Sequence, residues 1–205
     1  MVTNVLSMRM IRGPLGRVAA AVAIVAGLTA CDDTLGLRAF QEVEFDTLSA
    51  YAMTQTPISF PSAYSASAGI VVRVDPEMAF EVAFDLPGNG KVLLIPARRI
   101  SPTRLVTGIP TPSPQVGMQL IKGTFESMTK APSGGYAYDS TFQVGVGEGV
   151  VLELAGDACQ FSLASQQYAK LVVDSINATR RQIYFRAVRD PNCGFRSLQP
   201  GIPKN

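Results

Sequence analysis

The sequence of 205 residues contains no histidine and no tryptophan, and it has only three cysteines. The absence of histidine excludes a Ser-His-Asp or Cys-His hydrolase, because both need an imidazole to accept the proton of the nucleophile. It also excludes histidine-ligated zinc and the side chain that most often acts as a general base near neutral pH. An enzyme built from this chain would have to use carboxylates or serine–lysine chemistry.

The sequence also lacks an apolar run long enough to span a bilayer comfortably. The run Val18–Gly27 (VAAAVAIVAG) is shorter than the roughly 20 residues that a transmembrane helix needs. It follows a segment that contains Arg9, Arg12 and Arg17 and no acidic residue. A basic start followed by an apolar run of this length is typical of a secretory signal peptide.

The next residues, Leu28-Thr29-Ala30-Cys31, resemble the lipobox of bacterial lipoproteins, in which an aliphatic residue and two small residues precede a cysteine. The resemblance implies that the Cys31 thiol receives a diacylglyceryl group and that a dedicated peptidase cuts the chain before Cys31. It covers the N-terminus alone and suggests no family for the remaining residues. The alternative is an ordinary secretory peptide that is cleaved near Ala30, which would leave Cys31 as a spare thiol.

The lipobox predicts an organisation and a location. We expect a signal helix within residues 1–30, a tether over residues 31–39 and a single β-rich domain over residues 40–205. The expected location is the bacterial cell envelope, with the domain lipid-anchored to the outer or the inner membrane and exposed to the periplasm or the cell surface. The membrane, reached through the lipid anchor, is then the first expected partner.

The charge balance depends on this cleavage. Removing residues 1–30 removes three arginines and no acid, which leaves 15 basic against 16 acidic side chains. A chain close to neutral lacks the positive surface that nucleic-acid binding requires, so no nucleic-acid partner is expected.

Two cysteines remain after Cys31, namely Cys159 and Cys193. An even pair in an oxidising compartment predicts a disulfide, which would close a loop of about 35 residues. A thiol metal site or a redox pair is the alternative, but no C-x-x-C spacing and no histidine ligand supports it.

Hydrophobic residues alternate with a period of two over most of the chain, which predicts β-strands separated by Gly/Pro turns. Two hairpins are expected, formed by residues 70–74 with 79–84 and by residues 170–176 with 182–188. Phe80, Val82 and Phe84 should face one way and Glu81 the other. Residues 86–90 form a turn before a strand at 92–95, and the proline-rich residues 108–117 form a polyproline-like connection. We therefore predict an all-β fold, an antiparallel β-sandwich or barrel-like meander with at most a short helical turn near 161–170.

Several short motifs resemble functional sites without matching one. The segment Asp85–Gly90 has the start of a calcium loop but lacks two ligands, and Ser127-Met128-Thr129-Lys130 matches S-x-x-K without its companion motifs. Gly145–Gly149 departs from the dinucleotide-binding pattern. The sequence gives no reason to bring together any two of three carboxylates, Asp139, Asp157 and Asp174. No catalytic residue, metal or cofactor is therefore predicted.

Arginine is the one bias in composition along the chain, concentrated at Arg180, Arg181, Arg186, Arg189 and Arg196. These residues form either a solubilising face or a surface for an anionic envelope component or an acidic protein partner. The predicted function is a lipid-anchored binding or structural interaction module. The alternatives are an envelope hydrolase or lyase, or a substrate-binding lipoprotein of a transporter, although the chain is short for the last.

Overall fold

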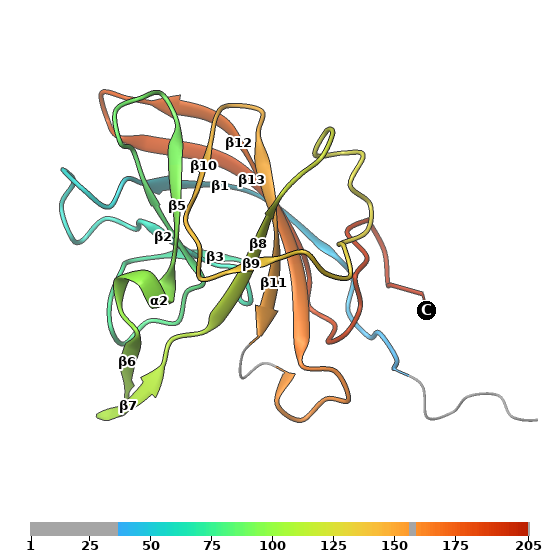
Figure 1. Cartoon of the computed structure of the whole chain (residues 1–205). Coiled ribbons are helices and arrows are strands. Elements are labelled where there is room, and N and C mark those ends of the chain that lie inside the picture. The colour runs from blue at the N-terminus through green and yellow to red at the C-terminus, as the bar shows by residue number, and fades with distance from the viewer. Residues whose placement is uncertain (1–36, 156–158, 205) are drawn as a thin grey trace, which may run out of the picture. The chain divides into compact units, whose positions relative to one another are not determined.

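The computed structural model describes residues 37–155 and 159–204. The predicted signal helix, the first residues of the tether with Cys31, and Asp157 lie outside these ranges. Within them, the strands form a six-stranded sheet, a five-stranded sheet and a two-stranded ribbon, with antiparallel pairing throughout (Figure 1). The prediction of an all-β antiparallel fold is confirmed.

The six-stranded sheet has the strand order β1-β13-β12-β11-β8-β9. In that order the strands are Glu44–Tyr51, Gln182–Asp190, Gln166–Asn177, Gly149–Ala155, Gln115–Leu120 and Ala137–Tyr138. The five-stranded sheet has the order β10-β5-β4-β2-β3, and its strands are Phe142–Val144, Val92–Pro96, Val82–Asp85, Ala63–Ser65 and Ile70–Val72. The ribbon pairs β6 (Thr103–Val106) with β7 (Ile109–Pro112), and the short helix α2 spans Ala97–Ile100.

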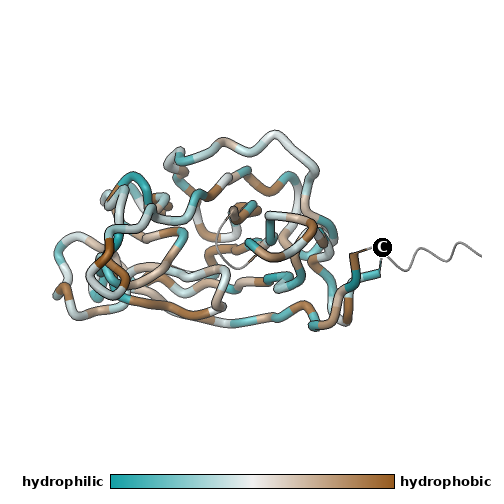
Figure 2. Tube along the Cα trace, turned by 90° about the horizontal axis from the view of Figure 1, so that it is seen from below, coloured by the Kyte–Doolittle hydropathy of each residue, from teal (hydrophilic) through white to brown (hydrophobic). Residues whose placement is uncertain are grey.

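The two large sheets pack face to face as a sandwich, because alternate residues of each strand point toward the other sheet. Figure 2 shows hydrophobic stretches (brown) interspersed with more hydrophilic ones (white to teal) along the tube. Phe185 on β13 is fully buried, and its ring centroid lies 4.9 Å from that of Phe84 and 5.5 Å from that of Tyr64 on the opposite sheet. This aromatic contact lies in the main core, where side chains of both sheets meet.

A second layer covers the outer face of the six-stranded sheet. Val151, Val172 and Val188 point away from the main core and pack against Phe125 and Leu198. Phe125 belongs to the segment between β8 and β9, and Leu198 to the segment that follows β13. The sheet is therefore buried on both faces in this region, and the covering segments carry most of the polar groups considered below.

Two of the predicted turns are confirmed in detail. Strands β12 and β13 pair from Tyr168 with Asp190 to Asn177 with Gln182, with a bulge between Val173 and Ser175. Strands β4 and β5 form the expected hairpin around residues 86–90.

The predicted hairpin between residues 70–74 and 79–84 is wrong. Strand β2 lies between β3 and β4 and pairs with both. The expected facing pattern is wrong for the same segment: Val82 and Phe84 enter the main core, but Phe80 packs with Ala83 in a separate outer cluster. Strand β4 begins only at Val82, so the two-residue alternation does not extend back through Glu81, which is buried.

The proline-rich residues 108–117 differ from a polyproline-like connection. Ile109–Pro112 form strand β7, and Gln115–Gly117 begin strand β8. A two-stranded ribbon accepts Pro110 and Pro112, because each of its strands has an unpaired edge that needs no N–H donor. The helical turn α2 was not predicted. Near residues 161–170, the Ser162 amide donates to the Cys159 carbonyl in a single turn, and strand β12 begins at Gln166.

Candidate functional site

The predicted arginine surface is divided by the geometry of strand β13. Arg186 shares the outer face of this strand with Val188, whereas Arg189 points to the other side, where its guanidinium donates to the Ser67 carbonyl at 2.7 Å. Arg181 lies at the opposite end of β13, in the turn that follows β12. The arginines are therefore spread over both faces and both ends of the strand.

Three of these arginines form ion pairs within the domain. Arg181 pairs with Asp85 at 3.3 Å, Arg186 pairs with Asp174 and Glu126 at 3.0 Å each, and Arg189 pairs with Glu44. Hydrogen bonds to Glu126 and Asp174 raise the pKa of Arg186 above its ordinary value. A charge that is neutralised by a neighbouring carboxylate contributes little to the attraction of an external anion.

Arg196 has a different environment. It lies in the segment after β13, between the buried side chains Phe195 and Leu198. This segment forms a short antiparallel bridge with residues 129–131: the Ala131 amide donates to the Arg196 carbonyl at 2.8 Å, and the Leu198 amide donates to the Thr129 carbonyl at 2.9 Å. The bridge pairs Lys130 with Ser197, the residue that follows Arg196.

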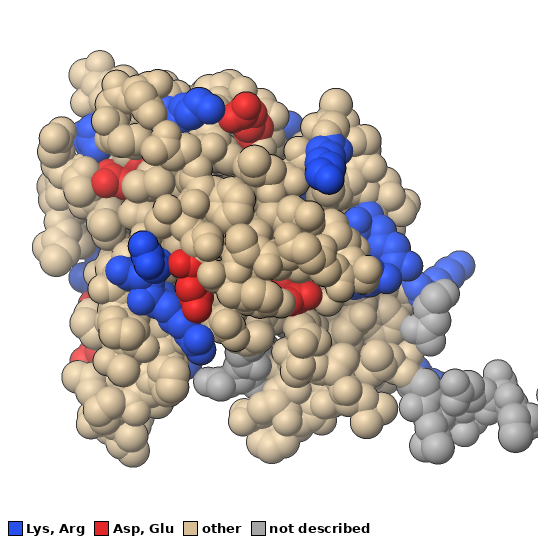
Figure 3. Space-filling model, in the orientation of Figure 1, with Lys and Arg blue, Asp and Glu red and all other residues tan. Residues whose placement is uncertain are grey.

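A pocket of about 360 Å³ opens at this bridge. Three basic residues line it, Lys130, Arg196 and Lys204, together with the polar residues Thr129, Ser197 and Gln199. No acidic residue belongs to the lining, and none of the three cations is in an ion pair within residues 37–155 and 159–204. Figure 3 shows Lys and Arg side chains at this edge of the molecule, beside the C-terminal end. We refer to Lys130, Arg196 and Lys204 as the cationic pocket.

Only Arg196 of this set was a predicted site residue. Lys130 drew attention solely as the last residue of the S-x-x-K match, and Lys204 carried no signal. The three residues are far apart in the sequence and belong to different segments, so no local pattern reveals them. An arginine-rich C-terminal segment was the only available indication.

The other sequence motifs are structural. The Ser127 hydroxyl donates to the Thr124 carbonyl at 2.8 Å, inside a tight turn. Asp85 accepts hydrogen bonds from the Thr54 hydroxyl and the Leu86 amide and so shapes the turn of the β4–β5 hairpin. Asp139 pairs with Arg98 and Asp174 pairs with Arg186, so each of these carboxylates has its own cation. In the part of the chain that the structure describes, no cluster of His, Cys, Asp and Glu could hold a metal ion.

Two buried ionisable side chains on the outer face of the six-stranded sheet, Glu153 and Lys170, have hydrogen-bond partners. The Glu153 carboxylate accepts from the hydroxyls of Tyr138 and, at 3.1 Å, Tyr168. Burial raises the pKa of Tyr168 to about 12, and the negative charge of Glu153 adds to this effect. The Lys170 ammonium donates to the carbonyls of Phe125 and Met128, each at 2.7 Å, and its burial lowers its pKa. These bonds fasten the segment between β8 and β9 onto the sheet.

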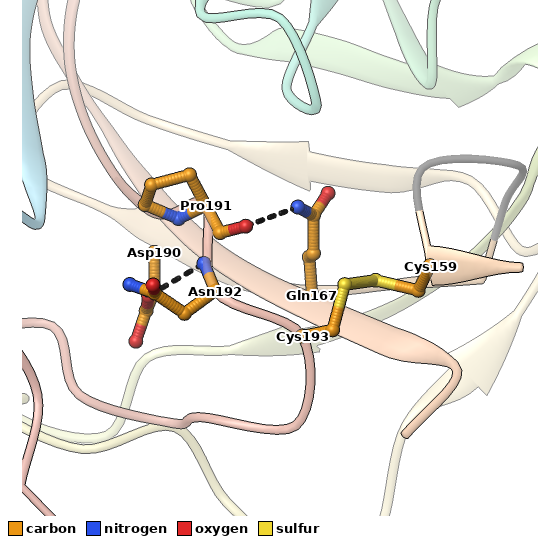
Figure 4. Close-up of a disulfide and its surroundings, with 6 residues drawn as sticks. All are labelled: Cys159, Gln167, Asp190, Pro191, Asn192 and Cys193. Atoms are coloured by element: carbon orange, nitrogen blue, oxygen red, sulfur yellow. Dashed lines mark hydrogen bonds between the residues drawn. A yellow bond between two sulfur atoms is a disulfide. The ribbon is translucent and has the colours of Figure 1, made fainter. Parts of the chain in front are cut away.

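The disulfide between Cys159 and Cys193 is confirmed (Figure 4). It lies close to the cationic pocket, because Gly194, the residue after Cys193, lines that pocket. Hydrogen bonds surround the bridge: the Gln167 side-chain amide donates to the Pro191 carbonyl at 2.6 Å, and the Asn192 amide donates to Asp190 at 2.9 Å. The segment that follows β13 is therefore held by covalent and polar contacts on one side of the pocket.

The fold and the site define an antiparallel β-sandwich with a cationic pocket at one end. Comparison of the chain with protein-family models, with curated proteins and with solved structures found no match. Among the helices in residues 37–155 and 159–204, none has the length and apolar character needed to cross a membrane.

Proposed function

We propose that this protein is a lipid-anchored cell-envelope protein whose β-sandwich is a binding module for an anionic ligand. The cationic pocket carries the proposal. Three cations without a neutralising carboxylate converge there, together with hydroxyl and amide donors, and such a set suits carboxylate, sulfate or phosphate groups. The lipobox and the disulfide support an exported location, because disulfides persist in oxidising compartments.

The pocket suits a multivalent anion such as an acidic polysaccharide of the envelope. Lysine and arginine side chains that line an open pocket attract anions electrostatically over about one Debye length, roughly 8 Å at physiological salt. Repeated anionic groups along a polymer can meet several of these cations at once. Binding of this kind should weaken as the salt concentration rises.

The test is binding of polygalacturonate, an acidic polysaccharide, to the full-length protein in detergent at low and physiological salt. The triple variant Lys130→Ala, Arg196→Ala, Lys204→Ala should bind about tenfold more weakly, which corresponds to about 1.4 kcal/mol. The matched control is Arg73→Ala, Lys122→Ala, Arg180→Ala, which removes the same charge elsewhere on the surface. Equal weakening in both variants, or none in the first, would contradict the proposal, and neutral dextran should not bind.

A further inference from the structure

The loop that begins at Cys159 exposes two large apolar side chains. Phe161 is 95% exposed and Leu163 is 83% exposed. Among residues 37–155 and 159–204, Phe161 is the most exposed phenylalanine and Leu163 the most exposed leucine. Clustered exposed apolar side chains are typical of surfaces that contact another protein or a membrane.

This loop is held in place from two directions. The disulfide ties Cys159 to Cys193, and the Gly194 amide donates to the Gln166 carbonyl at 2.8 Å. Ala164 also packs closely on Gly194: a Cβ atom at this glycine would lie 2.5 Å from the Ala164 Cβ. These contacts hold the residues on both sides of Phe161 and Leu163.

The N-terminal end of the domain reaches the same place. A Cβ atom at Gly194 would lie 2.9 Å from the Leu37 side chain, so Leu37 and Ala164 contact the same glycine. The Phe40 amide then donates to the Asn192 side chain at 2.8 Å, and the Phe40 side chain is 81% exposed. In Figure 1 the start of the described chain and the loop before β12 both lie toward the lower edge of the molecule.

Chain length limits the distance between the loop and a lipid anchor. Six residue steps separate Cys31 from Leu37, and a fully extended chain spans at most about 3.3–3.6 Å per residue. A lipid on Cys31 would therefore hold Leu37 within about 20 Å of its attachment point. Anchoring at Cys31 brings the end of the domain that carries Phe40, Phe161 and Leu163 to the membrane.

We propose that Phe40, Phe161 and Leu163 insert into the interfacial region of the membrane to which Cys31 is attached. This inference rests on the proposed lipid anchor. In the interfacial region, these apolar side chains are transferred from water to the boundary between headgroups and acyl chains. The transfer adds to the membrane affinity of the anchor and fixes the orientation of the domain. The cationic pocket, which Gly194 also lines, would then open close to the membrane surface.

The absence of tryptophan allows a direct test. The Phe161→Trp variant introduces a single tryptophan into the full-length, lipidated protein, and excitation at the red edge of indole absorption avoids the emission of its tyrosines. After reconstitution into phosphatidylcholine vesicles, its emission should shift to shorter wavelength and should be strongly quenched when the acyl chains carry bromine. The matched control is Ile58→Trp, because Ile58 is 88% exposed in the connection between β1 and β2. The control should keep the emission of a water-exposed indole.

Labelling with a fatty-acid probe separates the two proposals. If the protein carries no label at Cys31, the anchor is disproved and this inference with it. If the labelled protein floats with the vesicles but the Phe161→Trp variant shows no shift and no quenching, the inference is overturned and the anchor stands. Equal quenching of the Phe161→Trp and Ile58→Trp variants would also overturn it, since no defined end of the domain would face the lipid.

Discussion

Glu81 is a buried carboxylate that directly precedes strand β4, where the predicted alternation placed it on the side opposite to Phe80, Val82 and Phe84. It is only 2% exposed, and its carboxylate accepts from the amides of Ala66 at 2.6 Å and Ser67 at 3.4 Å. These bonds give hydrogen-bond acceptors to two backbone amides of the turn between β2 and β3. Burial nevertheless raises the pKa of Glu81 above its ordinary value of 4.5, because desolvation outweighs the hydrogen bonds.

The raised pKa of Glu81 determines the sign of a pH effect on stability. Between 4.5 and the higher folded value, the folded state binds more protons than the unfolded state, so the free energy of unfolding falls as the pH rises. We expect Glu81→Gln, which keeps an acceptor oxygen, to gain stability relative to the wild type over this window and to match it at lower pH. Denaturant unfolding at several pH values measures this, with the exposed Glu77→Gln as the control. Parallel curves for the wild type and the Glu81→Gln variant would contradict the expectation.

Among the elements, the β12–β13 hairpin is the one that the disulfide closes. The disulfide joins the residues that flank this hairpin, with a sequence separation of 34. In the chain-entropy model, a loop of this size stabilises the fold by about 3–4 kcal/mol, because the bridge restricts the unfolded chain. The hairpin supplies two central strands of the six-stranded sheet, so its closure affects the whole sandwich.

Reduction of this bridge should lower the melting temperature by roughly 6–16 °C for a domain of this size. The measurement is thermal unfolding of the full-length protein with and without dithiothreitol. The double variant Cys159→Ala, Cys193→Ala serves as the control. Its melting temperature should be close to that of the reduced wild type and should not change when the reductant is added. Rapid alkylation of Cys159 and Cys193 in the native protein without reductant would show that the bridge does not form.

At the scale of the whole molecule, Arg181 joins the two sheets at one end of the sandwich. Its side chain extends from the β12–β13 turn and donates to the carbonyls of Thr54 and Leu86, each at 2.9 Å, and to Asp85 at 3.3 Å. Arg181 and Asp85 are both largely buried. Removal of the arginine therefore leaves acceptors without a donor in a place that water reaches poorly.

We expect Arg181→Ala to reduce the free energy of unfolding by about 2–3 kcal/mol. The loss of stability in Arg181→Lys should be smaller than in Arg181→Ala but still measurable, because an ammonium cannot reproduce the planar set of guanidinium donors. Arg73→Ala is the matched control: Arg73 pairs with Asp75 at 3.8 Å on the surface, and such pairs contribute at most about 1 kcal/mol. Chemical denaturation measures all three, and equal losses in Arg181→Ala and Arg73→Ala would show that Arg181 is not a tie between the sheets.

Hairpins whose two strands flank a short turn marked by Gly, Pro or Asn could be predicted from the sequence. The β12–β13 and β4–β5 hairpins are examples, because local patterning and a short turn determine each of them. The pairing of Cys159 with Cys193 followed from counting the cysteines that remain when Cys31 is set aside. The fold class and the disulfide could therefore be predicted from the hydrophobic pattern of single segments and from the positions of one residue type.

Only the tertiary structure decided which distant segments meet. Strand β2 is three residues long and carries no alternation that could announce it, yet it separates β3 from β4 and buries Glu81. Lys130, Arg196 and Lys204 converge because two covering segments pack on the sheet through the buried side chains of Phe125 and Leu198. Strand order and surface convergence depend on contacts between residues far apart in the chain, and local hydrophobic periodicity contains no information about those partners.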